Sequence, residues 1–510
     1  MNEYITLSSF GKDGVFTGRT KIVTSCLPES MQFAGYFGDT LDENTIAREL
    51  SKAISIHRKN AFEYRRLKEI YLGKQAILDR EQGDRKVNNK VVVNYAEPIT
   101  RDIVGFTYGN GIEYSARRTE KVGLVEELNN MVSVENKDAI NKAFGDGQSI
   151  GGRYYIAVMP DSLESNDVPF EFVDLDPEHT EVVYSAYNKN VPVFAWTENV
   201  AIENGKDVVV YTVWTNDRTY VIRGNSKKGL SVITQTFSVL GETTTLPYKP
   251  NPLGMIPIVE YQNNEFCRGD WESIVPLFDA ANSLTSDRVN DVEQIVESIL
   301  CIFGVDPESL DDLDANKKNF ALVFNGAPGI NQDAKFIVNP LDGDSVSKLT
   351  NYFESVIKFI AGIPERDAST GSDTGIAAEV RTGSGDLEIV AKNKCTYTKM
   401  AERRVLKLIL AICHGKNKLI GLDDSDVDIK IPYSRYYDVQ NMAQAMQILD
   451  AMNLDENDVA SAVKWPSDRT GMISRWKARK VKEEEKVAEA EKSASEAYTG
   501  NGGTNSEYFA

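Results

Sequence analysis

The residues best suited to bind a metal ion form a carboxylate pair, Asp174-Leu175-Asp176. Residues two apart on a strand point to the same face of a sheet, so both carboxylates could hold one cation. Carboxylates that share metal ions are typical of two-metal nucleases. The competing interpretation, which we favour, is a polar turn, because Pro177 and Glu178 follow at once. The pair keeps one alternative function open, a metal-dependent nuclease or another cytosolic enzyme that uses an Asp/Glu cluster.

Histidine and cysteine are scarce and scattered. The chain has three histidines and five cysteines, and no CxxC pair. We expect His57 at a helix surface or boundary, His179 in a solvated turn, and His414 at the C-terminal end of a long helix, where an imidazolium suits the helix dipole. The thiols are expected to be buried and reduced. The sequence also lacks a P-loop, a GxSxG elbow and an HExxH pair, so we predict no catalytic residue, metal or cofactor.

The charge balance is acidic. Lys and Arg number 57 against 76 Asp and Glu, which gives a net charge of −19. Proteins that coat nucleic acid use basic surfaces, so the balance argues against such a protein. It is compatible with a surface that duplex DNA passes without sticking. The purest apolar run, residues 408–413, is far shorter than the ~20 residues that span a bilayer, and we expect no membrane partner.

The elements that must position these residues are helical in some regions and β-rich in others. After an irregular arm over the first forty residues, apolar spacing predicts a helix over 42–72. A short β-branched run follows at 91–93, and an antiparallel meander is expected over 151–261. No helix-length segments alternate with these strands, so the predicted fold class is α+β.

Two amphipathic helices follow the meander. The first is predicted over 271–303. Its faces outside the apolar stripe carry five carboxylates: Asp279, Asp287, Asp291, Glu293 and Glu297. These carboxylates form either an ordinary solvated face or a wall that repels phosphate, and the pattern leaves both readings open. The second helix is expected over 344–363, with Leu349 and Ile360 on its buried side.

The remaining segments can be placed in order along the chain. Strands are predicted at 320–324 and 336–338, between the two helices. A polar loop over 364–375 leads to a longer helix over 376–413, which Gly383-Ser384-Gly385 interrupts. A strand at 427–431 and further helices follow, and the charges of both signs over 477–492 predict a solvated helix.

Several short motifs, in the order in which they occur, resemble those of one protein family. The most specific run is Leu253-Gly254-Met255-Ile256-Pro257-Ile258-Val259-Glu260-Tyr261-Gln262-Asn263-Asn264-Glu265, which continues into Gly269-Asp270-Trp271-Glu272. Weaker matches are Tyr71-Leu72-Gly73-Lys74, Asn88-Asn89-Lys90, Gly105-Phe106-Thr107-Tyr108-Gly109 and Thr374-Gly375-Ile376-Ala377. Over residues 45 to 480 the chain is similar to the portal proteins of tailed bacteriophages that infect Gram-positive bacteria.

The resemblance implies a ring of twelve subunits around a central channel, with a wing, a two-helix stem, a clip and a crown. The implied parts of this chain, in order, are an N-terminal arm 1–40, the wing 41–265, stem helix one 266–303, the clip 304–341, stem helix two 342–363, a tunnel loop 364–375, the long helix and return strand of the wing 376–437, crown helices 438–495 and a disordered tail 496–510.

The implied function is passage of double-stranded viral DNA at one capsid vertex during packaging and ejection, with no enzymatic activity. The stem carboxylates Asp279, Asp287, Asp291, Glu293 and Glu297 would then line the channel and repel phosphate. The tunnel-loop residues expected to touch DNA are Arg366, Asp367, Ser369, Thr370, Ser372, Asp373 and Thr374. The clip residues Glu308, Asp311, Asp312 and Asp314 would face a partner with a basic rim, although solvated charge explains them equally well.

The partners that the resemblance implies are further copies of this chain, viral DNA, the large subunit of the terminase, a head-completion or adaptor protein, and the major capsid and scaffolding proteins. The implied location is the portal vertex of the virion, with assembly in the host cytoplasm. A different ring component of a phage head or tail is a further alternative.

Overall fold

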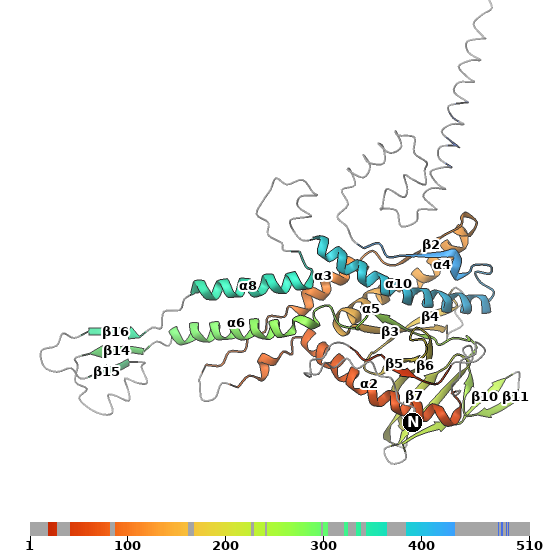
Figure 1. Cartoon of the computed structure of the whole chain (residues 1–510), viewed down its shortest axis with the longest axis horizontal. Helices are drawn as coiled ribbons and strands as arrows, with labels where there is room; N and C mark the ends of the chain where they lie inside the picture. Colours follow the sequence, from red (N-terminus) through yellow and green to blue (C-terminus); the bar gives the residue numbers. More distant parts are fainter. Residues whose placement is uncertain are drawn as a thin grey trace, which may run out of the picture.

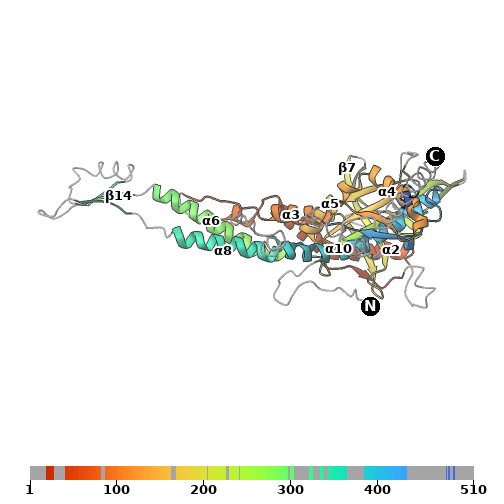
Figure 2. The same ribbon diagram turned by 90° about the horizontal axis from the view of Figure 1, so that it is seen from above.

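The computed structural model describes residues 19–27, 41–81, 87–161, 168–203, 205–225, 229–239, 242–296, 299–303, 321–324, 333–337, 343–364 and 384–433, with single positions at 478, 481, 482, 486 and 488. A mixed α/β body carries a long two-helix projection that ends in a small sheet (Figure 1). A second view shows the same projection extending from one end of the body (Figure 2). The α+β class is therefore as predicted.

The large sheet of the body runs in the order β1-β5-β6-β7-β8-β12, with β9 also paired to β8. The bounds of these strands are Val23–Thr24 (β1), Thr180–Ser185 (β5), Pro192–Glu203 (β6), Lys206–Trp214 (β7), Arg218–Asn225 (β8), Gly229–Ile233 (β9) and Lys249–Pro250 (β12). Helix α2 (Glu43–Tyr71) covers one face, where Ile46 and Leu50 share a core with Trp196 and Val213. The predicted helix over 42–72 is present, and β5 to β9 form an antiparallel meander within the predicted range of 151–261, whose other strands, apart from β12, belong to separate sheets.

The stretch 19–27 differs from the irregular arm expected at the start of the chain. Its Ile22, Val23 and Cys26 side chains are buried, and β1 pairs in parallel with β5. The Asn60 side chain of α2 binds both backbone groups of Thr20 at 3.0 Å. This stretch is therefore part of the core, because its backbone and its apolar side chains are both satisfied there. The remainder of 1–40 lies outside the described residues.

A second layer packs a small sheet, in the order β13-β3-β4, against helices. Its strands are Arg153–Pro160 (β3), Phe170–Leu175 (β4) and Ile258–Gln262 (β13), and its helices are α3 (Ala96–Tyr108), α4 (Val122–Val134), α5 (Lys137–Gly151) and α10 (Ser384–Gly415). β2 (Glu113–Ala116) pairs with β17 (Val427–Lys430), which is the strand predicted at 427–431. Cys395 and Cys413 are buried free thiols in this core, as expected. β10 (Gln235–Val239) and β11 (Glu242–Leu246) form a separate hairpin.

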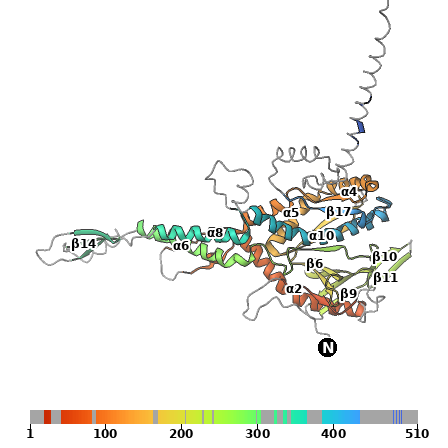
Figure 3. The same ribbon diagram turned by 45° about the horizontal axis from the view of Figure 1, so that its top comes forward.

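The projection consists of α6 (Val275–Val296) and α8 (Gly343–Ala361), called the hairpin below. The two helices lie side by side in each view (Figures 1 and 3). The helix predicted over 271–303 is too long, because Ile299–Phe303 forms strand β14 instead. This β-branched and aromatic run pairs with β15 (Ala321–Phe324) in a parallel arrangement and with β16 (Asp333–Ile337) in an antiparallel one. Strand pairing here prevails over the helical periodicity.

Candidate channel-forming hairpin

The hairpin leaves the body at a four-residue root, Gly269-Asp270-Trp271-Glu272. A Cβ at Gly269 would lie 2.4 Å from the backbone oxygen of Ile150 on α5, so a glycine is required at this approach. The Trp271 ring is fully buried, and its Nε1 donates to Thr100 Oγ1 of α3 at 3.0 Å. The motif singled out in the sequence therefore docks the start of the hairpin onto two helices of the body.

Two buried carboxylates complete this root. Asp270 Oδ2 accepts a hydrogen bond from Lys394 Nζ of α10 at 2.7 Å. Glu272 Oε1 accepts from Arg19 Nη1 at 3.0 Å, so the N-terminal stretch is tied to the root. A buried charge is strongly destabilising unless it is paired. These ion pairs therefore fix the position at which the hairpin departs from the body.

A segment without regular secondary structure, residues 87–94, runs alongside α6 and is called the strap. Three buried polar side chains of α6, Asn282, Ser286 and Asn290, form a polar ladder facing it. The ladder oxygens accept the strap N–H groups of residues 93, 91 and 89 at 2.8, 2.9 and 2.7 Å, respectively. The strap and α6 therefore run antiparallel, and the helix side chains take the place of a strand edge.

The spacing of the ladder explains why a helix can pair in this way. Residues four apart on a helix are ~6 Å apart along its axis, and residues two apart on an extended chain are ~6.6 Å apart. The ladder therefore presents one acceptor for every second N–H of the strap. From the sequence, residues 91–93 are noted only as a short β-branched run. The signal for their partner is the i, i+4, i+8 polar series on α6.

The described stem carboxylates differ in their partners. Asp287 forms an ion pair with Arg80, and Glu293 accepts a hydrogen bond from Asn89 of the strap. Burial raises the pKa of Asp279, and nearby Arg66 offsets part of this rise. Asp291 is exposed and forms no ion pair with another described residue. Glu297 lies outside the described residues.

Helix α8 exposes apolar side chains that the sequence pattern placed partly inside. Ile357 is buried in the root core with Phe278 of α6, as expected. Leu349 and Ile360, predicted to be buried, are 43% and 50% exposed. The four exposed apolar residues of α8, called the apolar stripe, are Leu349 (43%), Tyr352 (61%), Phe359 (78%) and Ile360 (50%). At ~100° per residue they fall within about 100° of one another, on one flank of the helix.

The other predicted site residues lie outside the described part of the chain. This holds for the tunnel-loop residues Arg366, Asp367, Ser369, Thr370, Ser372, Asp373 and Thr374. It also holds for the clip residues Glu308, Asp311, Asp312 and Asp314. The predicted crown over 438–495 is described only at single helical positions, and the start of the helix predicted over 376–413 is described from Ser384 onward.

The carboxylate pair considered for metal binding is engaged by protein groups. Asp174 accepts a hydrogen bond from the Tyr154 hydroxyl, and Asp176 forms an ion pair with Lys68 at 3.3 Å. Across the described ranges, no three His, Cys, Asp or Glu side chains are grouped so as to hold a metal ion. The pair therefore does not favour the nuclease alternative.

Of the three histidines, His57 was placed wrongly at a surface or boundary. Its side chain is buried, with Nδ1 3.0 Å from Glu181 Oε2 and its ring edge-on to Trp196 at 5.0 Å. His57 is buried because the large sheet packs against this face of α2. His179 is exposed in its turn, and His414 is exposed at the end of α10, as predicted.

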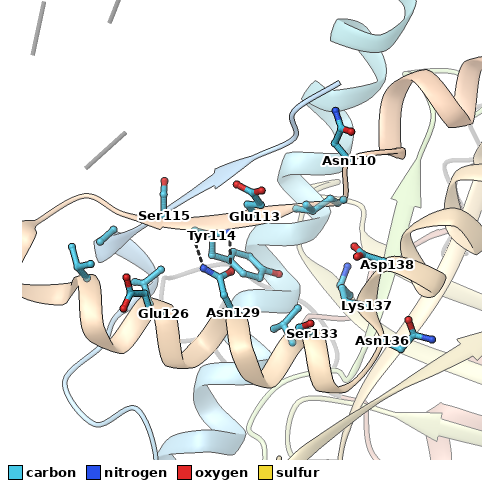
Figure 4. Close-up of a pocket in the computed structure, with 16 residues that line it drawn as sticks. Asn110, Glu113, Tyr114, Ser115, Glu126, Asn129, Ser133, Asn136, Lys137 and Asp138 are labelled. Atoms are coloured by element: carbon cyan, nitrogen blue, oxygen red, sulfur yellow. Dashed lines mark hydrogen bonds between the residues drawn. The ribbon is translucent and has the colours of Figure 1, made fainter. Parts of the chain in front are cut away.

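A groove of about 520 Å³ lies between β2 and α4 (Figure 4). Asn129 of α4 binds the backbone of Tyr114, accepting from its N–H at 3.2 Å and donating to its carbonyl at 2.8 Å. The side chain thus occupies the edge of β2 opposite β17, where another strand would otherwise pair. Lys137, which also lines the groove, donates to the buried Glu402 at 2.7 Å. These contacts give the groove a structural role.

Comparison with known proteins identifies the class to which this architecture belongs. Residues 50–486 match the family described as phage portal protein, SPP1 Gp6-like. The chain belongs to this family of phage portal proteins. Such proteins are generally structural rather than enzymatic, and membership implies a ring oligomer associated with the viral capsid and its DNA. No curated protein matches the chain. No helix within the described ranges is long and apolar enough to cross a membrane.

Proposed function

We propose that this protein forms the DNA channel at one capsid vertex, a ring of about twelve subunits through which double-stranded DNA is packaged and ejected. The observation that supports this most is the hairpin, whose length and exposed apolar stripe are poorly suited to an isolated chain. Exposed apolar patches of this kind mark protein contacts. Neighbouring copies would cover the stripe and enclose a channel.

Two different apolar surfaces of the hairpin suit a ring. The stripe lies on α8, and α6 carries a hollow of about 320 Å³ in which Val289 and Val292 are flanked by Arg288 and Glu293. A contact between two different patches is heterologous, and such contacts close into rings when the rotation permits. We infer that the stripe of one subunit packs near the hollow of the next.

The parts of the chain take the following roles in this proposal. Residues 41–265 form the wing, and the long helix and return strand over 376–437 complete it. The hairpin is the stem, and β14, β15 and β16 belong to the clip, which extends beyond the predicted range of 304–341. The clip would dock the large terminase subunit and then the head-completion or adaptor protein. The capsid and scaffolding proteins would contact the wing and the crown.

In the channel, Asp291 is the stem carboxylate with the strongest case for facing DNA. Asp287 and Glu293 are engaged by Arg80 and Asn89, which leaves less of their charge to act on phosphate. The tunnel loop over 364–375 would contact the DNA through Arg366 and its hydroxyl residues, and the clip acids would face the basic rim of a partner.

Mass photometry of the purified protein tests the proposal. We expect a dominant species near twelve copies of 56.8 kDa, and a ring with a central hole by negative-stain microscopy. A protein that remains a monomer at micromolar concentration, with and without DNA, would overturn the proposal. Metal-dependent cleavage of DNA by such a monomer would favour the nuclease alternative.

A further inference from the structure

Two cations converge on one aromatic ring at a small hollow in the body. The Lys21 Nζ lies 4.0 Å from the centroid of the Tyr184 ring, and the Arg404 Cζ lies 5.8 Å from the same centroid. Lys21 belongs to the N-terminal stretch, Tyr184 to β5 and Arg404 to α10. All three line a hollow of about 30 Å³, which exceeds the ~10–15 Å³ that one water molecule requires.

One carboxylate, that of Glu260, lines this hollow, and it also pairs with a cation outside the lining. Arg153 forms ion pairs with Glu260 at 3.0 Å and with Glu181 at 3.2 Å. Glu260 also accepts a hydrogen bond from the Tyr184 hydroxyl. Arg404 donates only to this hydroxyl and to the Asn190 carbonyl among the described residues. The charged residues that line the hollow are therefore the cations Lys21 and Arg404 and the carboxylate Glu260, which leaves one positive charge in excess.

Lys21 is the cation that most needs a further partner. An ammonium group has three N–H donors, yet within the described ranges Lys21 Nζ has the Tyr184 ring and no ion pair. Burial lowers the pKa of Lys21, Glu260 offsets part of this effect, and Arg153 and Arg404 lower the pKa further. An anion in the hollow would supply an acceptor for the Lys21 ammonium group and would stabilise both cations.

We propose that this hollow is a binding site for a carboxylate group, held between Lys21 and Arg404. A single carboxylate oxygen fits a hollow of about 30 Å³, and its charge complements the two cations. The carboxylate is either an acidic side chain of a second copy or a free small carboxylate. The site is built within one chain and does not depend on the proposed function.

Thermal unfolding with sodium acetate, compared with sodium chloride at equal ionic strength, tests the site. A ligand that binds only the folded state raises the unfolding midpoint with concentration. We expect acetate to raise the midpoint of the wild type beyond the chloride effect. In Lys21→Met this extra shift should need at least tenfold more acetate. The control Lys74→Met removes a lysine whose side chain is 68% exposed and should respond as the wild type does.

Arg404→Gln provides a second test that leaves the N-terminal stretch intact, and it should also weaken the acetate effect. Equal shifts from acetate and chloride in the wild type, or an undiminished acetate shift in both variants, would overturn the proposal.

The rate at which Lys21 is acylated distinguishes the two sources of the carboxylate, a side chain of a second copy and a free small carboxylate. Slower acylation on assembly in acetate-free buffer indicates a side chain of a second copy, and slower acylation only with acetate indicates a free carboxylate. An unchanged rate in both conditions would count against the site.

Discussion

At the residue scale, Glu181 holds together a buried set of polar groups from α2, β3 and β5. One carboxylate oxygen accepts from Arg153 at 3.2 Å and from the Tyr155 hydroxyl at 2.8 Å, and the other lies 3.0 Å from His57. Burial by itself raises the pKa of Glu181, but Arg153 and then His57 more than offset this, so the pKa is lowered. The ionised carboxylate therefore stabilises the folded chain.

Glu181→Gln removes this charge with little change in size. We expect it to reduce the free energy of unfolding by ~3–5 kcal/mol at pH 7, because Arg153 loses a buried partner. A carboxylate with a lowered pKa stabilises the fold above its unfolded-state pKa of ~4.3, and the contribution is lost as the pH falls. The difference between wild type and variant should therefore shrink below about pH 4.3. Chemical unfolding between pH 3 and 7 measures it.

The matched control is Glu69→Gln, whose side chain is 47% exposed and pairs with Lys74 at 3.4 Å. An exposed pair contributes little, so we expect a change within ~0.5 kcal/mol at each pH. A loss for Glu181→Gln that is as small as this, or one that grows on acidification, would contradict the assignment.

At the scale of elements, the polar ladder determines how α6 is held against the body. Ser286→Ala removes the acceptor of the Val91 N–H, and a buried donor without a partner costs ~1–3 kcal/mol. Hydrogen exchange of that amide should accelerate by roughly five- to 150-fold, because the opening free energy falls by the same amount. Ser283→Ala changes a serine of the same helix that makes no hydrogen bond to a described side chain or to the strap, and exchange at Val91 should be unaffected. Equal exchange in both variants would show that the ladder does not retain the strap.

The hairpin also shows what the sequence could and could not predict. Helix periodicity located α2 and α8, and the motif Gly269-Asp270-Trp271-Glu272 located the root. The helical periodicity gave the wrong secondary structure at 299–303, because a short apolar run is compatible with both a helix and a strand. Residues 91–93 did not reveal their pairing either, since the matching i, i+4, i+8 polar series lies on α6. Neither partner is adjacent in sequence, so local residues carried no signal for them.

At the scale of the whole molecule, the apolar stripe is exposed in a single chain, and we expect a second copy to bury it. Phe359 is 78% exposed, next to the buried face of α8 that contains Ile357. Burying a phenylalanine side chain contributes ~1.5–3 kcal/mol. In a ring each subunit makes this contact once with a neighbour, so its loss recurs at every subunit boundary. A sequence pattern cannot reveal this, because a helix face that packs on a second copy has the same periodicity as one that packs on its own chain.

Phe359→Asp should therefore lower the association constant between neighbouring subunits by at least ~10- to 150-fold, the equivalent of the lost apolar burial. The midpoint of thermal unfolding of the unassembled chain should change little, because the side chain is exposed there. Asn351→Asp places the same charge on an exposed position of α8, about 80° around the helix from the nearest stripe residue, so it should assemble as the wild type does. Mass photometry across a dilution series compares the three proteins.

Because both variants add one carboxylate to an already acidic helix pair, equal loss of rings in both would assign the effect to charge repulsion. Loss confined to Phe359→Asp would assign it to the apolar contact.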